Sequence, residues 1–127
     1  MVNIRGNKGF TLIEMLTVMA IMAILASIAT PSFMRSILRS REASLENTLF
    51  VVRDVIDQYY ADHGNYPDSL ETLKEKKYVR EIPKDPITAS SDTWILIPSE
   101  DEGATGIYDI HSGSKKISLA GTPYNEW

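Results

Sequence analysis

The stretch from Phe10 to Met34 limits most strongly what this chain can fold into. It is almost wholly apolar, and Glu14 is its single charged side chain. As a helix these residues would span roughly 37 Å, at about 1.5 Å per residue. The hydrocarbon core of a bilayer is about 30 Å thick. The sequence therefore predicts that residues 10–34 form a helix able to cross a membrane.

Length and composition bound the remainder. The chain has 127 residues, so residues 35–127 suffice for one small domain. It contains no cysteine, which excludes disulfides and thiolate ligands. Its net charge of −4 is the opposite of the basic character expected of a nucleic-acid-binding protein, so we expect no nucleic-acid partner.

The charges on either side of the apolar stretch give no clear orientation. Arg5 and Lys8 precede it and favour a cytoplasmic start, whereas three arginines follow it, at Arg35, Arg39 and Arg41. Small residues within the stretch allow close helix packing in lipid. Pro31 removes one main-chain donor, so we expect the helix to loosen there.

Glu14 is the informative residue of the stretch. A carboxylate inside a membrane helix costs about 2.5–3.5 kcal/mol and normally has a partner. We hypothesise that the partner is a new α-amino group, created by cleavage before Phe10, on the same or a neighbouring chain. Two alternatives stay open. One is a plain membrane anchor. The other is a secretory signal peptide cut after Ser27-Ile28-Ala29, ahead of a secreted enzyme or binding domain.

Helical spacing continues beyond the membrane segment. Apolar residues recur every three, four or seven positions, and no Gly or Pro interrupts residues 32–63. Gly64 and Pro67 then supply stop signals. The pattern predicts a helix from about Phe10 to about His63, whose second half packs on one face. We interpret Phe50, Tyr59 and Tyr60 as core or subunit-interface residues. The predicted stripe comprises Leu38, Leu45, Leu49, Val52, Ile56 and Tyr59.

Residues 64–127 predict a small α+β head. Asp68 and Glu71 have the spacing of a capping box that opens a short helix with Leu70 and Leu73 inward. Residues 93–97 and 106–111 predict two strands that pair as an antiparallel hairpin against the long helix. Residues 117–127 are loop-like, with a short third strand as an alternative. The chain lacks a Gly-rich phosphate loop and a G-x-S-x-G nucleophile elbow, so we expect no enzyme activity.

The start of the apolar stretch resembles the processing site of type IV pilins and type II secretion pseudopilins. The resemblance implies that a prepilin peptidase cuts between Gly9 and Phe10 and that Phe10 becomes N-methylated. It also implies that Glu14 is needed for assembly and that Pro31 is the helix-loosening proline. These features lie in Gly9-Phe10-Thr11-Leu12-Ile13-Glu14, the apolar residues that follow, and Pro31.

The head extends the resemblance to the major pseudopilins of type II secretion. It is carried by residues 60–67, 83–86, 108–113 and 125–127, and by the missing cysteine pair. It implies a pilin-like α+β fold with four parts: a cleaved leader (1–9), a transmembrane or filament-core helix (10–34), an amphipathic helix (35–63) and a head (64–127).

The same resemblance sets the expected location and partners. It implies a single-pass protein of the bacterial inner membrane with its head in the periplasm. The chain would assemble into a homo-oligomeric filament in the periplasm or at the cell surface. Its partners would be the prepilin peptidase, minor pilins and a secretion or pilus assembly platform. A type IV pilus subunit is the alternative within the family.

The resemblance to the major pseudopilins also implies that the C-terminal loop of this chain holds a calcium ion. Calcium takes six to eight oxygen ligands. Where the family loop offers aspartates, this chain has Ser114-Lys115-Lys116, and two lysines would repel a dication. The candidate ligands are Asp109, Ser112 and Asn125, with backbone carbonyls completing the set. The alternative is a simple lysine turn beside a solvated Asp109.

Overall fold

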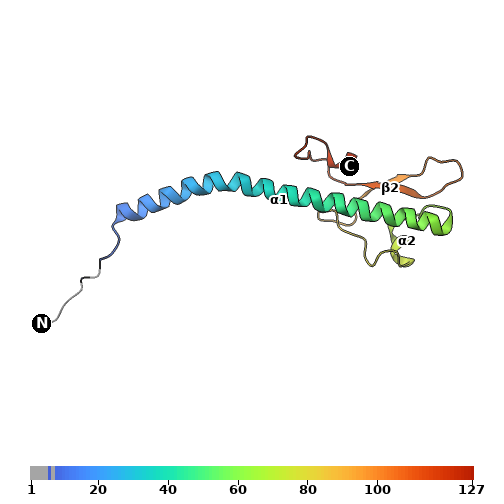
Figure 1. Ribbon diagram of the computed structural model, residues 1–127, viewed down its shortest axis with the longest axis horizontal. Helices are drawn as coiled ribbons and strands as arrows, with labels where there is room; N and C mark the ends of the chain where they lie inside the picture. Colours follow the sequence, from blue (N-terminus) through green and yellow to red (C-terminus); the bar gives the residue numbers. More distant parts are fainter. Residues whose placement is uncertain (1–5, 7) are drawn as a thin grey trace. The chain divides into compact units, whose positions relative to one another are not determined.

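The computed structural model describes Gly6 and residues 8–127. In chain order the elements are helix α1 (Leu12–His63), helix α2 (Leu70–Glu75), strand β1 (Ile95–Pro98), strand β2 (Ile107–His111) and the 3-10 helix η1 (Tyr124–Glu126) (Figure 1). The chain divides after Ile37 into an N-terminal unit and a C-terminal unit. Most of the predicted leader, residues 1–5 and 7, lies outside the described residues.

The first part of α1 belongs to the N-terminal unit and exposes its apolar side chains. Their exposed fractions run from 45% at Met15 to 83% at Phe10, just before the helix. The most apolar window of α1 has a mean hydropathy of 2.3, with none of it buried, so by length and composition this segment can cross a membrane. The helix continues through Pro31 without a break. The loosening expected at Pro31 stays a prediction.

The second part of α1 supports the C-terminal unit. It buries Leu45, Leu49, Val52, Val55, Ile56 and Tyr59 along one face. This face matches the predicted stripe except that Leu38 is only half-buried against the core and Val55 is added. The helix ends at His63, where Gly64 adopts a left-handed φ of 73°. The Gly64 N–H donates to the carbonyl of Tyr60 at 2.8 Å, which closes the last turn.

Helix α2 begins one residue later than the predicted capping box implies. The N-cap is Ser69, whose hydroxyl accepts from the N–H of Thr72 at 3.3 Å, so the prediction of Asp68 as the cap is wrong. Both residue types cap well, and Ser69 has the extended φ and ψ, −154° and 166°, that an N-cap residue adopts. Leu70 and Leu73 are buried, as predicted.

Strands β1 and β2 form the predicted antiparallel pair, with Ile95 opposite His111 and an irregularity between Ile97 and Pro98. The first strand starts at Ile95 rather than Thr93. Trp94 turns inward, where its indole N–H donates to the carbonyl of Pro83 at 2.8 Å. After β2, the described residues contain an isolated bridge between Ile117 and Pro123 instead of a third strand.

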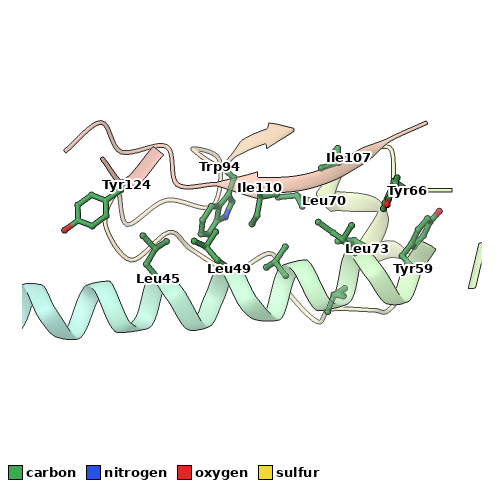
Figure 2. Packing of buried hydrophobic residues seen from close by; sticks show 13 residues of the cluster. Leu45, Leu49, Tyr59, Tyr66, Leu70, Leu73, Trp94, Ile107, Ile110 and Tyr124 are labelled. Atoms are coloured by element: carbon green, nitrogen blue, oxygen red, sulfur yellow. The ribbon is translucent and has the colours of Figure 1, made fainter. Parts of the chain in front are cut away.

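One hydrophobic core holds the C-terminal unit together. Side chains from the second part of α1 meet those of α2, β2 and the segments around Trp94 and Tyr124 (Figure 2). Figure 2 shows Leu45 and Leu49 pointing from α1 to the side on which Tyr124, Trp94 and Ile110 lie. The fold is therefore α+β: a long helix packed against a small two-stranded sheet, as the sequence predicts.

Candidate functional sites

The predicted cleavage site lies just ahead of α1. Lys8, Gly9 and Phe10 have no regular secondary structure and are all exposed. The helix starts at Leu12, slightly later than the predicted Phe10. A peptidase can reach an exposed, non-helical peptide bond without unwinding a helix, and the bond between Gly9 and Phe10 meets that condition.

Glu14 forms a capping box with Thr11. The Glu14 N–H donates to the Thr11 hydroxyl at 3.2 Å, and the Glu14 carboxylate accepts from the Thr11 N–H at 3.3 Å. A carboxylate in the first turn also complements the positive end of the helix dipole. This second role was missed by the sequence analysis, although Thr-x-x-Glu is the signature of a capping box. Glu14 also lines an apolar hollow with Phe10, Ile13, Thr17 and Val18.

Arg53 of α1 ties the end of the described chain to the helix. Its Nε lies 2.6 Å from Oδ1 of Asp109. Its Nη2 donates to the main-chain oxygens of Ile110 at 3.0 Å and Trp127 at 2.9 Å. His111 Nδ1 contacts the same Trp127 oxygen. One guanidinium therefore fixes both β2 and the C-terminal segment against α1.

Asp85 is a fully buried carboxylate that the sequence analysis did not single out. Oδ1 accepts from the N–H of Ile87 at 2.8 Å. Oδ2 accepts from the Ser112 hydroxyl at 2.5 Å and from the N–H of Gly113 at 3.2 Å. Asp85 thus joins the loop before β1 to the end of β2. Asp85 stands between two prolines in the sequence, which marks an irregular segment but does not reveal the partner.

The three predicted calcium ligands lie in different local environments. Asp109 is paired with Arg53, Ser112 is buried and donates to Asp85, and Asn125 lies in η1. Within Gly6 and residues 8–127, no group of three or more His, Asp or Glu side chains is placed to hold a metal ion. Calcium binding remains a prediction from the resemblance alone.

Glu42 connects the C-terminal loop to α1. Its Oε1 accepts from the Tyr124 hydroxyl at 2.7 Å and from the Leu119 N–H at 2.8 Å. Burial, together with the hydrogen bond to Glu42, raises the pKa of the Tyr124 hydroxyl to about 12. At the far end of α1, a hydrogen bond to Asp62 raises the pKa of Tyr78 to about 12.

Similarity to known proteins is found in both the N-terminal helix and the head. A family profile described as "Prokaryotic N-terminal methylation motif" matches residues 4–30. The type II secretion system core protein G of Klebsiella pneumoniae is 28% identical, over 83% of this chain and 82% of that protein. The competence protein ComGC of Halalkalibacterium halodurans is 34% identical, over 56% of this chain and 70% of that protein.

A pilin matches over a shorter range than core protein G does. The type IV major pilin protein PilE1 of Neisseria gonorrhoeae is 34% identical, over 59% of this chain and 50% of that protein. No solved structure gives a significant match.

These findings define the class of protein. An apolar N-terminal helix that carries a methylation motif, continued by a small α+β head, is the plan of a pilin-like subunit. The chain belongs to the type IV pilin-like family. Members of this family are structural proteins, so the chain is not an enzyme.

Proposed function

We propose that the chain is the major pseudopilin of a type II protein secretion system. One observation carries this choice within the family. Similarity to core protein G extends over 83% of the chain and 82% of that protein, and so includes the head. Similarity to the type IV pilin PilE1 covers 59% of the chain and 50% of that protein. The head is where secretion and pilus subunits must differ, since both share the N-terminal motif.

The proposed maturation starts at the exposed bond between Gly9 and Phe10. Prepilin peptidase cuts this bond, and the new α-amino group of Phe10 is methylated. The amine then lies four residues from Glu14, close enough to satisfy its carboxylate on the same or a neighbouring subunit. Before cleavage the capping box with Thr11 satisfies part of that carboxylate.

Assembly then exchanges lipid contacts for contacts between helices. The apolar side chains of residues 10–34 are exposed along the first part of α1 and must be covered either by lipid or by neighbouring helices. Small residues such as Ala20, Ala23 and Ala26 permit close approach of neighbouring helices. We infer that the subunit waits in the inner membrane with its head in the periplasm. An assembly platform and minor pilins would then draw it into a homo-oligomeric filament.

A type IV pilus subunit is the second candidate, and the match to PilE1 favours it specifically. The two functions are separated by deleting the gene in the bacterium that carries it. We expect the deletion to abolish export of the enzymes that the secretion system releases, while surface pili and twitching motility persist. The intact chain should restore export. A Gly9→Val variant, which the peptidase should not cut, should not restore it. Loss of pili with normal export would contradict the proposal.

A further inference from the structure

The head carries a groove on α1 that the described residues leave open. It is an open groove with a volume of about 500 Å³, lined by one face of α1 together with Trp127. Leu49, Phe50 and Trp127 supply its apolar surface. Phe50 is 71% exposed, more than Val51 at 46% or Tyr60 at 41% in the same half of α1.

The polar lining of the groove is acidic. Arg53 is already engaged by Asp109 and by two main-chain oxygens. The other charged lining residues are Glu46, Asp54 and Asp57, all exposed. An occupant of this groove should therefore combine apolar side chains with positive charge.

One segment of the same chain has that chemistry, and we call it the Lys115–Leu119 loop. Lys115 and Lys116 are exposed, and beside them Ile117 and Leu119 are 58% and 44% exposed. The loop is held in place by Leu119 N–H on Glu42 at 2.8 Å and by Ser118 N–H on the carbonyl of Thr122 at 2.8 Å. These hydrogen bonds fix the loop, so its exposed side chains form a defined surface.

The loop does not line the groove of its own chain. It is attached to α1 at Glu42, whereas the groove is centred near Phe50. Eight helical residues separate these levels, or about 12 Å along the helix axis. A second copy, displaced by about that distance, would bring its loop level with the groove. We propose that the Lys115–Leu119 loop of one subunit docks into the α1 groove of the next.

Such a contact joins two different surfaces of the same protein. Heterologous contacts of this kind build open helical filaments unless the rotation closes a ring. The inference therefore rests on the proposed function and adds to it the head surfaces through which neighbouring subunits meet. The lysine-rich end of α2 is a poorer occupant, because Lys76 and Lys77 have no exposed large apolar side chain beside them.

A charge-swap experiment in the full-length chain tests the docking, in cells that carry its assembly machinery. We expect Lys115→Glu with Lys116→Glu to reduce filament yield by roughly tenfold, because several charge pairs turn repulsive together. Asp54→Lys with Asp57→Lys should do the same, and combining all four changes should restore much of the yield. Lys76→Glu with Lys84→Glu, on exposed residues away from the loop, should leave the yield unchanged.

Cysteine cross-linking gives a second readout, which is clean because the chain has no cysteine of its own. Asp54→Cys combined with Lys115→Cys should give a ladder of dimers, trimers and longer species on oxidation. Either single variant should stop at dimers. Filaments without a ladder, and without sensitivity to the charge reversals, would overturn the docking and leave the proposed function intact. Failure of the unmodified chain to form filaments would overturn both.

Discussion

Removal of the Asp85 carboxylate should severely destabilise the head. Asp85 is 0% exposed and accepts hydrogen bonds from three donors, on Ile87, Ser112 and Gly113. In Asp85→Ala the Ser112 hydroxyl and the two N–H groups lose their acceptor. Each buried donor left without a partner costs about 1–3 kcal/mol. Allowing for partial relaxation around the smaller side chain, we expect a total loss of about 4 kcal/mol.

That loss is a large share of the total free energy of unfolding expected for the head. A domain the size of the C-terminal unit is typically stable by roughly 5–13 kcal/mol. For the isolated unit Leu38–Trp127, urea unfolding can be followed by tryptophan fluorescence. Trp94 is buried and its indole N–H donates to the carbonyl of Pro83, while Trp127 also contributes to the signal. With a urea dependence of about 1–2 kcal/mol per molar, the midpoint should fall by about 2–4 M.

Asp92→Ala is the matched control for this experiment. Asp92 lies in the same segment but is exposed, so its substitution should stay within about 0.5 kcal/mol of the unmodified head. If the free energy of unfolding of Asp85→Ala also lies within about 0.5 kcal/mol of the unmodified head, then Asp85 does not hold the loop before β1 to the end of β2, and its assignment is wrong.

Three further predictions concern the turn at Gly113, the hydroxyl of Tyr124 and the charge of Glu14. A Cβ on Gly113 would lie 1.9 Å from a main-chain oxygen, so Gly113→Ala should lower the urea midpoint by the equivalent of about 2 kcal/mol or more, and an unchanged midpoint would contradict that packing. The pKa of Tyr124 is raised to about 12 from about 10, so its stabilising contribution should be complete below pH 10 and decline as pH rises from 10 to 12. Tyr124→Phe should remove that part of the pH dependence in unfolding curves, and an unaltered alkaline slope would count against it. Glu14→Gln keeps a capping acceptor but removes the charge, whereas Glu14→Ala removes both, so filament counts by electron microscopy separate the roles. Charge pairing predicts that both variants fail to assemble, and normal filaments from Glu14→Gln would leave only the capping role.

Periodicity in the sequence was sufficient for α1 and for the part of the core that α1 supplies. The apolar stripe of α1 follows from helical spacing, and the stop at His63 follows from Gly64, because both signals are local. The two strands were placed within about two residues for the same reason. Local signals could not choose between Asp68 and Ser69 as the cap of α2, since both are good N-cap residues and the backbone decides between them.

The contacts that fasten the head could not be predicted, because they join residues distant in sequence. Arg53 and Asp109 are 56 positions apart, and Asp85 and Ser112 are 27 apart. No spacing rule connects such pairs, and a single buried carboxylate looks in the sequence like any surface aspartate. At Glu14 the local capping signature was present in the sequence. The cost of a charge in an apolar helix favoured the prediction of a cationic partner, and the cap was not predicted.

Mass spectrometry of the mature N-terminus tests the central claim most directly. The chain should be expressed in full length in cells that contain a prepilin peptidase and then extracted from their membranes. Processing as a pilin-like subunit predicts a mature protein that begins at N-methylated Phe10, and an uncut chain when the peptidase is absent. A protein that begins at Thr30, after signal-peptide cleavage, or one that stays uncut with the peptidase present, would contradict it.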